Sequence, residues 1–174
     1  MRALGFFLVP TLLSSLVVAC SPYALGEPKT PPIAAFGPAP SAELGTICVI
    51  RPSRAAVAVT FAVHDNHQLV GGTKGPSYFC YEVEPGEHVL VSDTFDTTDS
   101  AGEARIVTAA GTRYWVHQDY DNVLGSIHSK LSWIDEARAR ELIDGCDYVV
   151  ITEVPGNERL PGDRPIAKAK HSGG

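Results

Sequence analysis

Histidines and carboxylates are the first residues of this sequence to consider for chemistry. His64 and His67 flank Asp65 and Asn66, a spacing that could bring two imidazoles to one metal ion. A zinc site needs three or four ligands in a defined geometry, and no third ligand stands at a recognised spacing. We therefore expect no metal site and no cofactor, and we interpret this segment as a polar turn.

Nucleophilic catalysis has equally little support. Residues 125–129 read Gly-Ser-Ile-His-Ser and lack the second glycine of a nucleophile elbow. In the glycine-rich stretch 71–75, Lys74 is followed by glycine rather than serine or threonine, so it is not a phosphate loop. We expect no catalytic residues and a protein that is not an enzyme. The alternative is a hydrolase that uses His117 and Asp119 at a strand end.

The N-terminus has the pattern of an export signal. Arg2 supplies a positive charge, and residues 3–19 form an almost continuous apolar run that ends in Val-Val-Ala-Cys. This ending resembles the bacterial lipobox. The resemblance implies cleavage after Ala19 and lipid modification of Cys20, with acyl chains on both its thiol and its new amino group. More than one chain is needed, because a single acyl chain anchors a protein only marginally.

Three further cysteines follow the predicted lipidation site: Cys48, Cys80 and Cys146. Outside the cytoplasm disulfides form and persist, so one pair can form and one thiol is left over. We expect a Cys80–Cys146 bridge if the last strand returns beside the strand of Cys80, with Cys48 as a buried free thiol. The alternative is that none of the three pair.

The charge balance excludes two classes of partner. The chain carries 14 basic and 20 acidic residues, and loss of Arg2 with the signal would change its formal net charge from −6 to −7. Such a chain has no basic footprint for nucleic acid and no polybasic patch for anionic lipid. Membrane attachment must then come from the acyl chains.

Composition divides the chain into four parts. Residues 1–19 are the signal peptide, and residues 20–45 hold six of the thirteen prolines, which predicts an extended tether between membrane and domain. Residues 46–154 have the length of one domain. Residues 155–174 are rich in proline, glycine and charge, which predicts a disordered tail.

The domain reads as mainly β. Alternating and β-branched stretches predict seven or eight short strands, and turn residues at 65–67, at 85–86 and around Gly111 predict three hairpins. Asp135–Ile143 is the one convincing helix, with Asp135 at its start and Gly145 just beyond its end. We expect an antiparallel β-sandwich with one short C-terminal helix.

Several strand motifs resemble one known family. They are Arg51-Pro52-Ser53, Ser77-Tyr78-Phe79, the Pro-Gly-Glu-His turn at 85–88, the segment Ala-Gly-Thr-Arg-Tyr-Trp-Val at 110–116, and Leu-Ser-Trp-Ile-Asp-Glu at 131–136. Together they are similar to the DUF2846 family of small bacterial lipoproteins, across roughly residues 46–143. Similar turns and strands occur in PEGA-like and carboxypeptidase-regulatory-like β-sandwich modules. The resemblance implies a fold and an envelope location, and it carries no catalytic residues.

These observations combine into one expected function. We expect a lipid-anchored lipoprotein of the cell envelope, a non-catalytic binding or structural module whose partner is an envelope protein or a cell-wall component. Ser21 follows the lipidated cysteine, where an aspartate often means retention at the inner membrane. The absence of an aspartate at position 21 favours the outer membrane, with the domain facing the periplasm.

Overall fold

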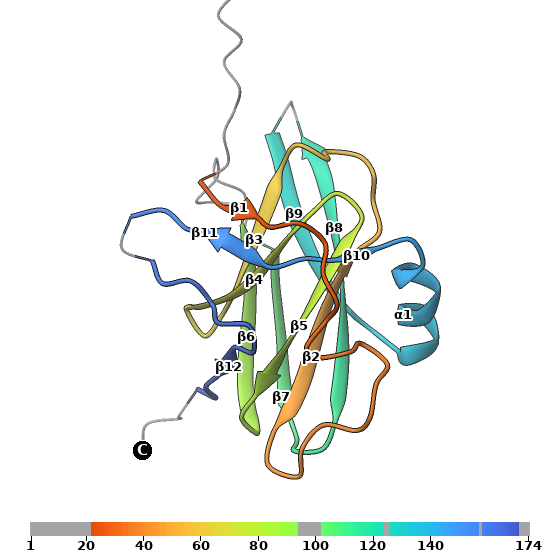
Figure 1. Cartoon of the computed structure of the whole chain (residues 1–174), viewed down its shortest axis with the longest axis vertical. Coiled ribbons are helices and arrows are strands. Elements are labelled where there is room, and N and C mark those ends of the chain that lie inside the picture. The colour runs from red at the N-terminus through yellow and green to blue at the C-terminus, as the bar shows by residue number, and fades with distance from the viewer. Residues whose placement is uncertain (1–21, 94–101, 124–125, 157, 171–174) are drawn as a thin grey trace, which may run out of the picture.

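The computed structural model describes residues 22–93, 102–123, 126–156 and 158–170. Two β-sheets pack face to face, with one helix outside them (Figure 1), which confirms the expected mainly-β sandwich. The predicted cleavage and lipidation residues, Ala19 and Cys20, lie outside the described residues. The described elements are β1 (Ala24–Leu25), β2 (Gly45–Arg51), β3 (Thr60–Asp65), β4 (Gln68–Lys74), β5 (Ser77–Val83), β6 (Gly86–Asp93), β7 (Gly102–Thr108), β8 (Arg113–Val123), β9 (Ser126–Ile134), α1 (Glu136–Ile143), β10 (Asp147–Tyr148), β11 (Ile151–Glu153) and β12 (Ile166–Ala167).

The two sheets differ in how their strands run. A six-stranded sheet has the order β10-β5-β2-β8-β9, with β12 also beside β5, and a four-stranded sheet has the order β4-β3-β6-β7. The four-stranded sheet is antiparallel, whereas the six-stranded sheet contains the parallel pairs β2–β8, β5–β10 and β5–β12. The sandwich is therefore mixed rather than wholly antiparallel. A third, two-stranded sheet joins β1 to β11.

The core lies between the inner faces of the two large sheets. Side chains alternate along a strand, so Ile47 and Val49 of β2 point inward while Cys48 points outward. Inward-facing aliphatic and aromatic side chains of both sheets form one cluster, which includes Phe79, Tyr81, Val63, Leu90 and Val116. Burial of this apolar area contributes about 25 cal/mol per Å² to the stability of the sandwich.

Two local predictions are confirmed. β3 and β4 form the expected hairpin, and its two turn residues, Asn66 and His67, have φ values of 47° and 68°. Positive φ at both central positions matches a type I′ turn, the turn whose twist suits two-residue hairpins. The helix starts at the N-cap Asp135, whose side chain accepts a hydrogen bond from Arg138 N at 2.7 Å, and Gly145 follows it with φ of 76°.

The other two predicted hairpins are wrong. The Pro85–Gly86 turn lies between β5 of the six-stranded sheet and β6 of the four-stranded sheet, so these strands do not pair. The turn around Gly111 likewise carries the chain from β7 back to β8 in the other sheet. Proline and glycine predict that the chain reverses at these places, but they do not determine which sheet the next strand joins.

The predicted Cys80–Cys146 disulfide is also wrong. Cys48 and Cys80 are directly opposite each other on the antiparallel strands β2 and β5, and the structure joins them in a disulfide. Cys146 is the free cysteine, just after α1. The strand that follows it, β10, does run beside β5, but it pairs Asp147 with Ser77, which leaves Cys146 before the strand and away from Cys80.

The proline-rich segment is not an extended tether over its described part. β1 pairs with β11, and the apolar side chains of Ile33 and Ala35 are buried against the outer face of the six-stranded sheet. Proline removes backbone donors but does not prevent burial of the apolar residues between the prolines. The folded unit therefore begins more than twenty residues before the predicted boundary at 46.

The described part of the predicted tail is folded as well. β12 pairs with the end of β5, and Ala167 is fully buried. We call residues 155–170 the C-terminal segment. With β10, it covers the edge of β5 that would otherwise expose unpaired backbone groups.

Candidate functional site

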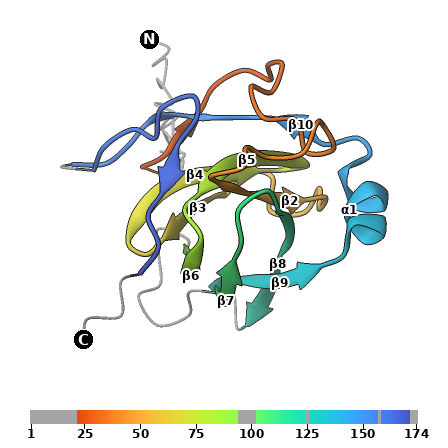
Figure 2. The same ribbon diagram turned by 90° about the horizontal axis from the view of Figure 1, so that it is seen from below.

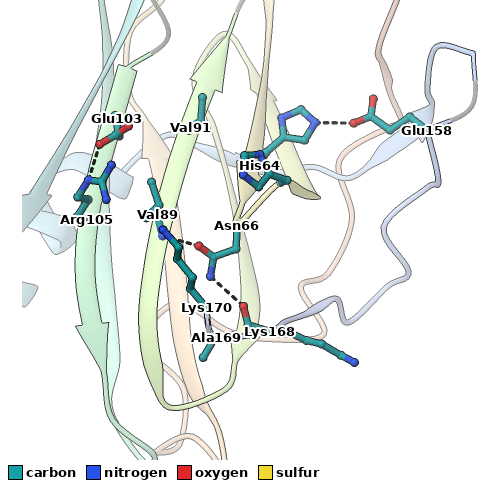
Figure 3. Close-up of a pocket in the computed structure, with 11 residues that line it drawn as sticks. His64, Asn66, Val89, Val91, Glu103, Arg105, Glu158, Lys168, Ala169 and Lys170 are labelled. Carbon is teal, nitrogen blue, oxygen red and sulfur yellow. Dashed lines mark hydrogen bonds and ion pairs between the residues drawn. The ribbon is translucent and has the colours of Figure 1, made fainter. Parts of the chain in front are cut away.

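A groove on the outer face of the four-stranded sheet is the best candidate for a functional site (Figure 3). Its volume is about 730 Å³. β3, the turn between β3 and β4, β6 and β7 supply one part of the lining, and the C-terminal segment supplies the rest. The lining residues are His64, Asn66, His67, Val89, Val91, Glu103, Arg105, Glu158, Lys168, Ala169 and Lys170.

Strand alternation explains the composition of the groove. On β6, His88, Leu90 and Ser92 are buried in the sandwich, so Val89 and Val91 project from the opposite face and form an apolar floor. The pairing of β6 with β7 places Arg105 opposite Val89 and Glu103 opposite Val91. The floor is thus apolar and the side formed by β7 is charged.

His64 and Glu158 form the opposite side. His64 Nε2 lies within hydrogen-bond distance of Glu158 Oε1, and both side chains are mostly shielded from solvent, at 18% and 24% exposed. The second oxygen of Glu158 accepts a hydrogen bond from the Tyr23 hydroxyl at 2.8 Å. Glu158 therefore ties the C-terminal segment to both the groove and the first described residues of the chain.

The charged side chains on the β7 side of the groove form only weak, exposed ion pairs. Arg105 Nε lies 2.6 Å from Glu103 Oε1, and Arg105 Nη1 lies 3.7 Å from Glu87 Oε1. All three side chains are about half exposed, and exposed ion pairs contribute only about 0–1 kcal/mol. A bound molecule could therefore form ion pairs with these side chains with little loss in the stability of the fold.

The third side of the groove is basic. Lys168 and Lys170 project from the end of the C-terminal segment, and within the described part of the chain neither ammonium group makes an ion pair. Asn66 fixes this segment, since its Nδ2 donates to Lys168 O at 2.9 Å and to Glu87 O at 3.0 Å. The turn that the sequence predicts as merely polar thus joins three parts of the structure.

A buried ionic network lies beneath the groove. The Asp65 carboxylate accepts hydrogen bonds from His88 Nδ1 at 2.8 Å and from the Tyr81 hydroxyl at 3.0 Å, and His88 Nε2 donates to Glu84 O at 2.8 Å. Both ring nitrogens of His88 face acceptors, so the imidazole holds both protons. Burial lowers the pKa of His88, but the Asp65 carboxylate and the Glu84 carbonyl raise it by more, so it lies above its ordinary value.

His117 and Asp119 lie elsewhere. They project from β8 on the outer face of the six-stranded sheet, on the opposite layer from the groove. Burial lowers the pKa of His117, as does the nearby Arg138 charge, although Asp119 opposes both. Ser132 of β9 is directly opposite His117, but among the described residues no side-chain hydrogen bond of His117 to a serine or cysteine is present.

The free cysteine is poorly suited to nucleophilic chemistry. Burial and the neighbouring carboxylates of Asp147 and Asp144 raise the pKa of Cys146 to about 11. Because the thiolate is the reactive form, a thiol with such a pKa is largely unreactive near neutral pH. Its Sγ lies 3.4 Å from Leu142 O.

Most residues that line this groove carry no functional signal in the sequence. Glu158, Lys168 and Lys170 belong to the segment predicted as disordered, and no sequence periodicity marks them. The one signal that could have found them is the pair Ile166–Ala167, which is apolar within an otherwise polar stretch.

Comparisons with known proteins add no assignment: no family model matches the chain, and no curated protein sequence matches it. Within the described residues no cluster of three or more histidine, cysteine, aspartate or glutamate side chains could hold a metal ion. No helix in this part of the chain is both long and apolar enough to cross a bilayer.

Proposed function

We propose that this protein is a lipid-anchored, non-catalytic module of the bacterial cell envelope that binds an envelope protein or a cell-wall component in the groove. The observation that carries this proposal is the groove itself: an apolar floor bordered by charges of both signs, on the part of the four-stranded sheet's outer face that the other described residues leave open. Membership in the DUF2846 family is part of the proposal and rests on the sequence motifs.

The lining favours a ligand that offers both apolar and charged groups. Val89 and Val91 can contact aliphatic groups, while Lys168 and Lys170 can bind carboxylates and Glu103 can bind an ammonium group. Envelope peptides and the peptide stems of a cell wall carry these groups together. No serine or cysteine lines the groove in the described chain, which favours binding over turnover.

The anchor is the second part of the proposal. Lipidation of Cys20 after cleavage at Ala19 would hold the domain at the membrane, and Ser21 favours the outer membrane with the domain in the periplasm. Mass spectrometry of the N-terminal peptide from membranes tests it. We expect a cysteine that carries acyl chains, and an unmodified Cys20 or an intact Met1 would contradict it.

Binding is tested with purified cell-wall sacculi and detergent-extracted envelope proteins, each applied to the immobilised protein. We expect the double charge reversal Lys168→Glu and Lys170→Glu to abolish retention. The matched control is Arg54→Glu with Arg138→Glu, which reverses two exposed charges outside the groove. Equal retention by both variants, or no retention by the wild-type protein, would overturn the proposed groove function, and breakdown of the sacculi would favour a hydrolase.

A further inference from the structure

The distance between the predicted lipid and the folded domain is very short. Cys20 would carry the acyl chains, and β1 already begins at Ala24. An extended chain spans at most about 3.6 Å per residue, so Tyr23 lies within about 11 Å of the lipidated cysteine. The proline-rich segment cannot serve as a spacer, because its described part is packed on the domain.

We infer that the end of the domain formed by β1, β11 and the start of the C-terminal segment rests on the lipid bilayer. This inference rests on the proposed lipidation of Cys20. β1 and β11 lie together on the side of the molecule away from α1 (Figure 1). A chain of three residues from the lipid to Tyr23 leaves no length for this end to stand clear of the headgroups.

The side chains at this end suit a headgroup layer. The Tyr23 hydroxyl donates a hydrogen bond to the Glu158 carboxylate. Arg159 and Leu160, which follow Glu158 in the chain, are both exposed, and Leu160 is 52% exposed. Arginine and an aliphatic side chain side by side can place a charge among headgroups and a hydrocarbon group below them.

The charges at this end predict that the contact does not depend on anionic lipid. Arg159 is accompanied by the exposed Glu153 of β11, and Lys29 is paired with Asp163 at 2.7 Å. A surface with balanced charges has little electrostatic attraction to a bilayer. The acyl chains supply the affinity, and Leu160 and Arg159 set the orientation.

This orientation also places one end of the groove. Glu158 contacts both Tyr23 and His64, so the His64 side of the groove lies next to the membrane-facing end. A ligand of the groove would therefore be reached at the membrane surface rather than deep in the periplasm.

The test uses an environment-sensitive fluorophore on the full, lipidated protein. In a Cys146→Ser background, a single cysteine replaces Leu160, or Arg138 on α1 as the matched control, and each is labelled and reconstituted into vesicles of neutral or of part-anionic lipid. We expect the label at 160 to shift to shorter wavelength and to be quenched by doxyl-labelled lipid in both vesicle types. The label at 138 should do neither.

A second variant separates contact from anchoring. Ten glycine and serine residues inserted between Ser21 and Pro22 add a flexible reach of about 17 Å, and we expect the blue shift and quenching at 160 to weaken. Mass spectrometry of Cys20 on the same samples distinguishes the failures. A lipidated protein whose label at 160 stays as water-exposed as that at 138 overturns the contact alone, whereas an unmodified Cys20 overturns the anchor as well.

Discussion

The two outer faces of the sandwich are each covered in part, and the covered part of one differs from the open part of the other. The outer face of the six-stranded sheet is covered over β5 and β2, where the Cys48–Cys80 disulfide lies beneath Ile33, Ala35 and Phe36. Its β8–β9 part is not covered, since Asp119 and Lys130 are exposed there. Phe36 stacks on Trp115 with ring centroids 6.0 Å apart, and Arg140 of α1 lies over Phe36 at 4.2 Å. Seen from below, α1 lies beside β2 and β8 on this side (Figure 2). We call this the covered face.

The outer face of the four-stranded sheet is only half closed. Its β3–β4 part is buried under β11, where Ala62 and Leu69 pack with Ile151. Its β6–β7 part stays open and carries the groove, with Val107 74% exposed beside it. The chain thus covers β5 and β2 with apolar contacts and leaves an apolar floor bordered by charges over β6 and β7. This difference indicates that the covered face contributes stability and the open part of the four-stranded sheet contributes binding.

The largest expected effect comes from the network beneath the groove floor. Asp65→Ala would remove the carboxylate partner of the buried His88 and the acceptor of the Tyr81 hydroxyl. Removal of one partner of a buried ion pair costs about 3–5 kcal/mol. We expect that loss in the free energy of unfolding from urea denaturation. Glu141→Ala on α1 breaks an exposed pair and should cost at most about 0.5 kcal/mol, and similar values for the two variants would contradict the assignment.

Loss of the disulfide should destabilise the covered face nearly as much. The bridge closes a loop with a sequence separation of 32 residues, which in the chain-entropy model stabilises the fold by about 3–4 kcal/mol. We expect that decrease in the unfolding free energy of the double variant Cys48→Ala, Cys80→Ala. Cys146→Ser should change it far less. Three reactive thiols in the unfolded, unreduced mature domain would show that the bridge does not form.

A smaller effect follows from the titration of His88. Its pKa is raised above 6.5 in the folded state, so its stabilising contribution is fully present below about pH 6.5 and is lost as the pH rises through the folded pKa. We expect wild-type stability to fall over that range and His88→Gln to flatten the curve. A rise in stability over the same range, with the His88 ring titrating below 6.5 by NMR, would contradict the doubly protonated imidazole.

Charge reversal in the groove should have the smallest effect on stability. Lys168 and Lys170 are exposed and make no ion pair within the described chain, so their replacement by glutamate should shift the unfolding free energy by no more than about 0.5 kcal/mol. Thermal unfolding of both variants beside the wild type measures this. A large loss would assign the lysines to the fold rather than to a ligand.

The sequence predicted the features that depend on local chemistry. Asn66 and His67 at a tight turn, Asp135 at the helix start and the alternating strands are all local signals, and the structure has them where they were expected. The sandwich itself followed from the number and spacing of such strands. The groove floor is implicit in the alternation of Val89 and Val91.

The features that could not be predicted from the sequence depend on contacts between residues far apart in the chain. The Cys48–Cys80 bridge requires the register of β2 against β5, and the two wrong hairpins require knowledge of which sheet a strand joins. The groove needs Glu158 and Lys168 to reach β3 across about one hundred residues of chain, through contacts that no local pattern encodes. Both end segments are rich in proline, which predicted extended or disordered chain. The few apolar residues that pack these segments against the domain gave too weak a signal to change that prediction.

Site-specific photo-cross-linking in living cells tests the contrast between the two faces most directly. A benzophenone amino acid at Val107, beside the groove, is compared with one at the exposed Glu141 on α1. We predict a discrete adduct of an envelope component from position 107 that is absent from position 141 and is lost on combining Lys168→Glu with Lys170→Glu. The same adduct from position 141, or an adduct at 107 that survives the charge reversal, would contradict it.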